Sequence, residues 1–444
     1  MSSSPGILSH PDFRRLWIAD LLSQLGSRLG MMAAPLLAVL TLNASTLQVS
    51  LLRTSETAAW LVLGLFAGAW VDRVRCLPVL VAADLGRAVL LGSIPVAAWF
   101  GVLTLAQLYV VLALTGLLTV LFDVAHSSYP PRLLAPEQLL PGNAKLAANH
   151  SVAAVLGAGA GGFLVQWLSA AVTLGLDALS FVWSAIWLRS IRTPEPRPAP
   201  AERPNLRREI GEGLRYVFTH PLLRPIALNQ TTTMLFQAAS GAVMIVFLVR
   251  EIHLSPSLIG VLSMTGLLGA LAASWFTERL STRIGDARAL VLGSAAIGVA
   301  FTLQALTTPG WGLAWYVLGT LLAAIGIIVS YIVAISARQR LCPPDLQGRV
   351  SATMSFVSWG AAPIGSLLGG LTATAVGLRT TLLAAGLATL LGASWLLPPT
   401  QTPLVPSPRP LHQLAPSRRQ LAPRSAPAAA AARIRPARRA GRRG

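Results

Sequence analysis

Apolar segments separated by short polar turns follow one another along most of this 444-residue chain. About 20 apolar residues are enough for a helix to cross the roughly 30 Å hydrocarbon layer of a bilayer. Twelve segments reach that length: residues 15–42, 46–70, 77–99, 103–128, 146–167, 171–190, 223–249, 256–278, 287–307, 311–336, 350–376 and 378–397. Because no segment shows the alternating pattern of a strand, we predict an all-α membrane protein with twelve transmembrane helices.

Composition agrees with a membrane protein and argues against most soluble classes. Hydrophobic residues make up 54% of the chain and charged residues only 11%, which is typical of a polytopic membrane protein. The net charge of +19 does not indicate a nucleic-acid partner, because ten of the 35 basic residues follow Pro399 and most others fall in alternate loops. The chain has no Gly-rich phosphate loop, no histidine spacing typical of a metal site and no apparent Ser/His/Asp set. We therefore expect no enzyme activity, no cofactor and no metal.

The distribution of arginine between the loops predicts the orientation. One set of loops carries most of the basic residues, among them Arg73, Arg132 and Arg340, whereas the opposite set contains only Arg250 and Arg379. Basic loops of membrane proteins stay on the cytoplasmic side. We therefore expect a multi-pass protein of a bacterial inner membrane, with both termini and the central linker in the cytoplasm.

A proline-rich and charged stretch divides the chain into halves. Its second part places Leu206, Ile210 and Leu214 on one helical face. Two interpretations stay open, a helix lying along the membrane surface or a soluble connector packed on the loops. The predicted domains are a first bundle at 1–190, the linker at 191–221, a second bundle at 222–398 and a disordered basic tail at 399–444.

Two motifs recur at one spacing in the two halves. The pattern R-L-x-x-P-[ED] occurs at 132–137 and at 340–345, and Gly-x-x-x-Gly-Gly occurs at 157–162 and at 365–370; each pair is 208 residues apart. A shared offset of unrelated motifs implies two six-helix bundles related by a pseudo-twofold axis along the membrane normal. The glycines predict close helix crossings.

Several motifs carry a resemblance to a known family. The turn Gly-x-x-x-Asp-Arg at 68–73, with a looser counterpart at 278–279, resembles the loop 2–3 signature of the major facilitator superfamily. The likeness covers residues 10–398. The stretches EIGEGLRYVFTHPLLR and LQGRVSATMSFVSWGAAPIGSLLGG resemble the macrolide-efflux and enterobactin-exporter branch. The resemblance implies a central cavity between the bundles, alternating access, and export of hydrophobic or amphiphilic molecules, usually driven by protons.

The embedded carboxylates are the candidates for proton coupling. All of them belong to the first half: Asp20, Glu56, Asp84, Asp123 and Asp177. We therefore expect the second half to present a largely apolar face to the cavity. Coupling needs a carboxylate whose pKa changes between desolvated and hydrated states. We predict Glu56 first and Asp177 second in this role, with Arg28 as counter-charge, although Arg53 can instead simply neutralise Glu56.

Charges near the cytoplasmic ends are the candidates for gating. They are Asp72, Arg73, Asp84, Arg87 and Asp123, with Glu278 and Arg279 as their echo in the second half. Charges at these depths are expensive and usually functional. They form either an ionic latch that closes the inner gate or a static folding network, and Asp72-Arg73 can also be an ordinary turn.

Polar side chains in the second half are the candidates for substrate contacts, namely Asn229, Gln237 and Gln304. The leading interpretation is a monomeric secondary transporter that exports a small molecule of the drug, macrolide or siderophore class, by proton antiport, with membrane lipids around it. One alternative is a facilitator or importer of a small anion drawn to Arg28 and Arg53. The other is a transporter-like receptor or scaffold that carries no flux.

Overall fold

The computed structural model describes residues 7–71, 73–195, 206–343 and 346–397. Three of the sequence predictions, on Asp72, on residues 196–205 of the linker and on the tail at 399–444, therefore fall partly or wholly outside the described residues. The described residues belong to one compact unit, and the predicted domain boundaries remain a proposal.

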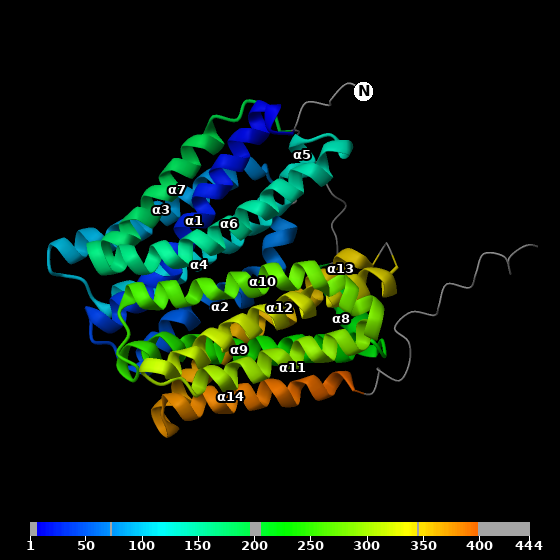
Figure 1. The fold of residues 1–444 in the computed structure, drawn as a ribbon. Coiled ribbons are helices and arrows are strands. Elements are labelled where there is room, and N and C mark those ends of the chain that lie inside the picture. Colours follow the sequence, from blue (N-terminus) through cyan, green and yellow to red (C-terminus); the bar gives the residue numbers. More distant parts are fainter. Residues whose placement is uncertain (1–6, 72, 196–205, 344–345, 398–444) are drawn as a thin grey trace, which may run out of the picture. The chain divides into compact units, whose positions relative to one another are not determined.

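The described residues form α-helices joined by short turns, with no strand among them (Figure 1). The first half contains α1 (Pro11–Leu40), α2 (Thr46–Val71), α3 (Cys76–Trp99), α4 (Leu105–Ser128), the short α5 (Pro130–Leu133), α6 (Pro136–Leu168) and α7 (Ala170–Arg189). The linker contributes α8 (Leu206–Thr219). The second half contains α9 (Leu223–Arg250), α10 (Pro256–Ile284), α11 (Asp286–Ala305), α12 (Leu313–Leu341), α13 (Gln347–Val376) and α14 (Leu378–Gly392).

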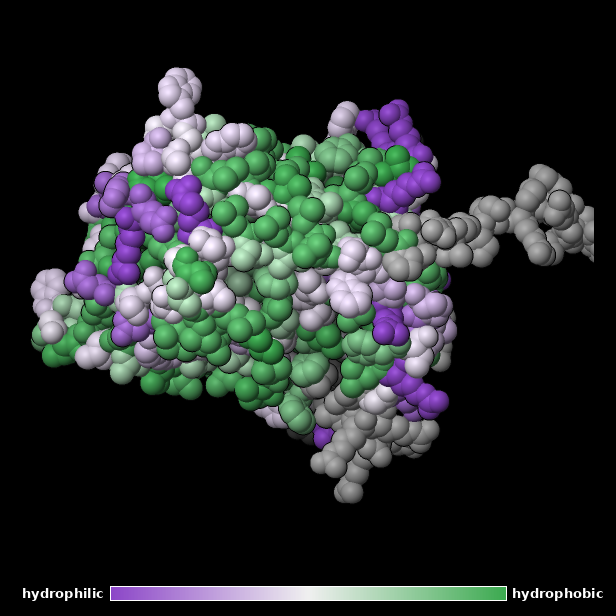
Figure 2. Space-filling model, turned by 90° about the horizontal axis from the view of Figure 1, so that it is seen from below, coloured by the Kyte–Doolittle hydropathy of each residue, from purple (hydrophilic) through white to green (hydrophobic). Residues whose placement is uncertain are grey.

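Apart from α5 and α8, these helices stand at the positions of the twelve predicted segments. Eight are long and apolar enough to cross a membrane by themselves, and α6, bent by 44° between Ala154 and Gly159, makes a ninth. Of the others, α14 has only 15 residues and α2 carries Arg53 and Glu56. Figure 2 shows apolar side chains over the middle of one face and hydrophilic ones gathered toward its two ends, as expected of a membrane-embedded surface.

The two halves repeat each other's helix contacts. In the first, α1 packs on α6 and α7, α3 on α4 and α7, and α2 on α4; in the second, α9 packs on α13 and α14, α11 on α12 and α14, and α10 on α12. Each contact recurs six transmembrane helices later in the chain. The all-α fold of two pseudo-twofold-related six-helix bundles is thereby confirmed.

Backbone turns repeat as well. Ser169, between α6 and α7, has a φ of 86°, and Gly377, 208 residues later between α13 and α14, has a φ of 90°. Asn43 and His253, in the turns that follow α1 and α9, also match, with φ values of 50° and 59°. Positive φ is uncommon outside glycine, so this match supports the internal duplication.

The repeated glycines make the predicted close crossings. Gly157 of α6 lies against Arg28 of α1, and Gly365 of α13 lies against Leu235 of α9, so each packs on the first helix of its own bundle. The last glycine of each motif faces the other bundle. A Cβ on Gly162 would lie 2.9 Å from the Cα of Gly260 in α10.

Among the described residues, the buried core that the two bundles share lies at one end of the helices. We call the end with the start of α1 and with α8 the linker end, on the right of Figure 1, and the other the distal end. At the distal end one buried cluster contains side chains of both bundles, such as Leu36 and Phe247. Toward the linker end Phe13 and Val350 belong to separate clusters, one in each bundle, and α6 and α10 diverge in that direction (Figure 1).

The linker helix α8 packs on α9 and α13 of the second bundle. Val217 is fully buried, the Glu212 carboxylate lies 2.6 Å from the Arg349 guanidinium, and the Tyr216 hydroxyl donates to the Leu341 carbonyl. These contacts favour the connector interpretation over the helix on the membrane surface.

Candidate functional site

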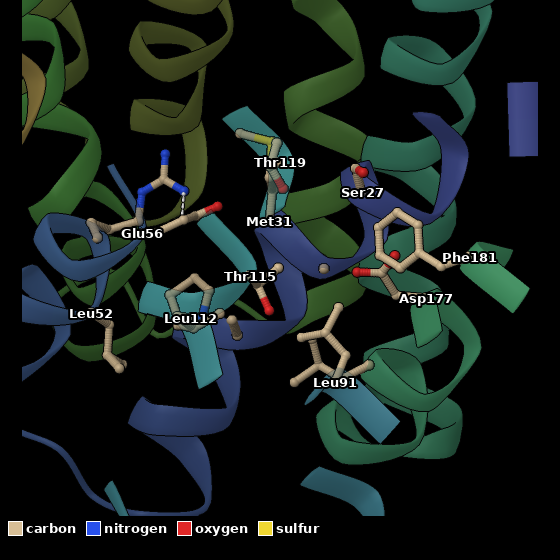
Figure 3. A pocket seen from close by; sticks show the side chains of 15 residues that line it. Ser27, Met31, Leu52, Glu56, Leu91, Leu112, Thr115, Thr119, Asp177 and Phe181 are labelled. Atoms are coloured by element: carbon tan, nitrogen blue, oxygen red, sulfur yellow. Dashed lines mark hydrogen bonds and ion pairs between the residues drawn. The ribbon is translucent and has the colours of Figure 1, made fainter. Parts of the chain in front are cut away.

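A small cavity inside the first bundle brings together both predicted coupling carboxylates (Figure 3). Its volume is about 150 Å³, and its walls come from α1, α2, α3, α4 and α7. Asp177 of α7 lies at one side of it, and Glu56 of α2 lies at the other. Leu91, Leu112 and Phe181 make much of the remaining wall apolar.

Asp177 is buried, with 2% of its surface exposed. Its carboxylate lies against α1 where Gly26 and Gly30, one helical turn apart, leave the backbone bare. A Cβ on Gly26 would stand 2.6 Å from its Oδ1, and one on Gly30 would meet its Oδ2. The Oδ1 atom has no hydrogen-bond partner among the described residues. Arg87 acts on this carboxylate electrostatically, but no described residue forms an ion pair with it. A carboxylate beside a cavity in this state can take up and release a proton.

Glu56 is neutralised by its neighbour on the same helix. The Arg53 guanidinium donates to the Glu56 carboxylate at 2.8 Å, and both side chains remain about 30% exposed toward the cavity. Arg28 has a different partner, because its guanidinium lies 2.8 Å from Nε2 of His150 on α6. Its proposed role as counter-charge to Glu56 or Asp177 stays a prediction.

A buried ion pair lies next to this cavity. Arg87 and Asp84, one turn apart on α3, form a salt bridge with 2% and 0% of their side-chain surfaces exposed. The guanidinium carbon lies 4.3 Å from the ring centre of Phe122 and 4.1 Å from that of Phe181. Both rings are close enough to stabilise the cation. These contacts agree with the interpretation of a static folding network.

A second group of polar side chains lies further toward the linker end of the first bundle. Nε2 of His126 on α4 is 3.1 Å from the Asp20 carboxylate of α1, and the Asn149 amide of α6 donates to the same carboxylate at 2.8 Å. Asp123, one turn from His126, is exposed and interacts electrostatically with Arg87. The structure thus brings together three predicted gating residues of the first bundle, Asp84, Arg87 and Asp123, while their action as a latch stays a prediction.

Neither His126 nor Asn149 was predicted from the sequence. His126 was missed because the histidines were considered only as metal ligands. The spacing of Asp123 and His126 on one helix face was an available signal. Glu195, in the linker, was missed as well. It accepts from the backbone N–H groups of Cys76 and Leu77 at the start of α3, at 2.7 and 3.0 Å.

The Glu195 carboxylate also lies 2.7 Å from the Arg132 guanidinium. In the second bundle Arg340, the repeat partner of Arg132, pairs with Asp286 at the start of α11. An arginine of each repeated motif therefore meets an acid at the start of the bundle's third helix. Such an acid also interacts favourably with the helix N-terminus.

The remaining predicted gating residues lie at exposed positions. Arg73 is exposed in the turn before α3. On α10, the Arg279 guanidinium stands 4.2 Å from the ring centre of Trp275, and Glu278 lines a separate cavity with Asp286. Their part in gating stays a prediction.

The second bundle has a larger cavity, of about 420 Å³, between α9, α11, α12 and α13. Gln237 and Asn229 line it, as do several serines. No acidic residue of the described chain lines this cavity, in keeping with the expected, largely apolar face, but the serines and Arg338 add polar groups that were not predicted from the sequence. Asn229 is tied to its neighbours, donating to the Gly392 carbonyl at 3.1 Å and accepting from Ser294 at 2.9 Å. Gln304 donates to Thr320 and is not part of the wall of this cavity.

This arrangement matches a known family over most of the chain. The family model of the Major Facilitator Superfamily matches residues 16–358 and 226–439. The chain belongs to this superfamily. It is 29% identical to the multidrug efflux pump Tap of Mycolicibacterium fortuitum, over 84% of this chain and 92% of that protein. It is 26% identical to the class C tetracycline resistance protein of Escherichia coli, over 56% of this chain and 61% of that protein.

A solved structure agrees on the fold. A bacterial homologue of the iron transporter ferroportin, in its inward-facing state, superposes with a TM-score of 0.70 at 18% identity, over 88% of this chain and 98% of that one. As a superfamily member the chain is a multi-pass membrane transporter and not an enzyme. The narrower macrolide-efflux and enterobactin-exporter branch stays a prediction.

Proposed function

We propose that this superfamily transporter exports small hydrophobic or amphiphilic compounds in exchange for protons, with Asp177 as the coupling carboxylate. Two of the relatives reported above are a multidrug efflux pump and a tetracycline resistance protein. They support export of drug-like molecules from the cytoplasm. We expect a monomer in the inner membrane with both termini in the cytoplasm.

The observation that carries the proposal is the unpaired carboxylate of Asp177 beside the cavity of the first bundle. That cavity, at about 150 Å³, is smaller than the roughly 300–1,000 Å³ of drug-sized sites. It has room for water and protons, whereas a substrate needs another place. Glu56 is the weaker candidate, because Arg53 already balances its charge.

The distribution of the buried cores supports the proposed transport cycle. With the linker end in the cytoplasm, a shared core at the distal end corresponds to an inward-open state. A proton on Asp177 removes the charge that the bare backbone of Gly26 and Gly30 leaves unbalanced. Protonation therefore changes the free energy of the α1–α7 contact, and it biases the conformational equilibrium only if the two states hold the carboxylate differently.

The test is tetracycline uptake into inverted membrane vesicles under an imposed pH gradient. We expect Asp177→Asn to reduce uptake to the level of vesicles that lack the protein, because the amide cannot bind a proton. The matched control is the double variant Arg53→Gln/Glu56→Gln, which removes a balanced pair from the same cavity and should retain uptake. Full uptake by Asp177→Asn, or loss confined to the double variant, would reject Asp177.

The alternative of an anion facilitator loses support at one of its two named residues. Arg28 is hydrogen bonded to His150, and Arg53 is paired with Glu56. The Glu56 carboxylate balances the charge of Arg53, whereas His150 carries no negative charge and leaves the charge of Arg28 in place, so only Arg53 is withdrawn from an anionic solute.

A further inference from the structure

We propose that the cavity of the second bundle binds the carboxylate of an amphiphilic substrate, with Arg338 as the recognising cation. The inference rests on the proposed function and adds the chemical class of the substrate. The volume of about 420 Å³ lies within the roughly 300–1,000 Å³ of small-molecule sites. Such sites combine apolar walls with a few polar groups that fix the ligand's orientation.

Arg338 is the charged member of the cavity wall in the described part of the chain. The next two arginines along the chain already have acidic partners, because Arg340 pairs with Asp286 and Arg349 pairs with Glu212. Arg338 is half-buried and makes no ion pair with any described residue. A half-buried guanidinium without an anion has lost hydration that a ligand carboxylate can replace, and its planar fork matches a carboxylate in two hydrogen bonds.

Two hydroxyl groups in the same wall lack hydrogen-bond partners. Oγ1 of Thr233 on α9 and Oγ of Ser330 on α12 are buried and unpaired among the described residues, and both residues line the cavity. Buried polar atoms are normally satisfied. The Ser330 hydroxyl now lies against Gly293 of α11, and rotation of either side chain about χ1 would present its unpaired hydroxyl to a polar group of the ligand.

The apolar part of the wall gives the other half of the recognition. Trp359 of α13 lines the cavity, and its ring stacks on that of Trp60 in α2, with centroids 5.9 Å apart and planes at 24°. A flat or acyl apolar body can pack on such a ring. Because Trp60 belongs to the first bundle, a ligand on Trp359 also touches a contact between the bundles.

The test measures binding to the purified full-length protein without a pH gradient. The probe is dansyl-undecanoic acid, and its matched control is the primary amide of the same molecule. We expect the acid to bind the wild type more tightly than the amide. Arg338→Gln should weaken binding of the acid roughly 10- to 150-fold, since hydrogen bonds to charged groups contribute about 1.5–3 kcal/mol. Binding of the amide should stay unchanged, which shows that the variant is folded.

Two further variants separate a local role from a general one. Arg338→Lys should keep part of the preference for the acid, because the charge remains without the fork. Arg340→Gln, two residues further along α12, should leave both probes unaffected. Equal affinity of the wild type for acid and amide, or an Arg338→Gln variant that binds the acid as the wild type does, overturns the proposal.

These outcomes are distinguishable from those of the uptake test. Binding of the acid through Arg338 without pH-driven export would reject proton-coupled efflux and leave this site standing. Export of tetracycline by a protein that does not discriminate between the two probes would do the reverse.

Discussion

A single methyl group on Gly162 should move the conformational equilibrium of the transporter. Gly162 of α6 crosses Gly260 of α10 at the distal end, where a Cβ would stand 2.9 Å from the Gly260 Cα and closer still to the Pro256 carbonyl oxygen. The preceding Gly161 faces α1 of its own bundle, where a Cβ would lie at an ordinary 3.5 Å from the Met32 Cβ. Gly162→Ala and Gly161→Ala therefore add the same group one position apart, with opposite consequences.

The size of the effect follows from the contact. Carbon atoms pack at about 3.5–4.0 Å, so a methyl group on Gly162 must separate α6 from α10. Overpacking of this kind costs about 1–3 kcal/mol. Conformations with the distal end closed bear this cost, and those with it open do not. The ratio of open to closed should rise about 5- to 150-fold, whereas Gly161→Ala should leave it unchanged.

The assay uses a contact further toward the distal end than Gly162. The backbone N–H of Ser257 on α10 donates to the Gln166 side chain of α6 at 3.3 Å. Cysteines at these two positions, in a protein with Cys76→Ser and Cys342→Ser, should be joined by a short bifunctional maleimide in detergent. We expect Gly162→Ala to slow that cross-link at least severalfold. If Gly162→Ala and Gly161→Ala cross-link at the same rate, the distal contact does not control the equilibrium.

Two further predictions concern stability in detergent. Asp84→Leu should lower the free energy of unfolding by about 3–5 kcal/mol, because it leaves Arg87 buried without its partner. The double variant Asp84→Leu/Arg87→Met should recover most of the lost stability. Equal losses of stability in both variants would contradict this reasoning. Burial lowers the pKa of His220 below its usual 6.5, and its neutral Nδ1 accepts from Leu222 and Leu223. The unfolded chain then binds the proton more readily, so stability should fall as pH drops below about 6.5. His220→Asn should flatten this part of the profile of melting temperature against pH, and an unchanged slope would assign the acid sensitivity to other groups.

Most of the fold was predictable because lipid restricts the backbone to helices whose length must match the bilayer. The segment predicted at 46–70 is the helix Thr46–Val71, and that at 77–99 is Cys76–Trp99. The largest error is in α6, which begins at Pro136 and not near 146. Pro136 occupies the first helical turn, where proline is favoured, and the helix continues through residues too polar to count as membrane-spanning.

The candidate site was predictable only in part. Glu56 and Asp177 were found because a carboxylate stands out in an apolar segment, whereas the identity of its partner depends on which helices cross. The bare backbone that receives Asp177 was visible in the spacing of Gly26 and Gly30, but nothing in the sequence says which helix packs there. Arg338 was not predicted as a substrate contact, because its lack of a partner appears only when the helices are assembled.

The two bundles share backbone geometry but differ in the side chains that line their cavities. Glycine crossings recur in both bundles because a close backbone approach excludes larger side chains at those positions. Turns with positive φ recur because corresponding helices are joined in the same way. Cavity residues are under no such constraint. The cavity of the first bundle contains Asp177, and the cavity of the second contains Arg338. If both proposals hold, proton and substrate occupy different bundles and do not compete for one carboxylate. Coupling must then pass through contacts between the bundles, and the stacked rings of Trp60 and Trp359 connect the two sides of that interface.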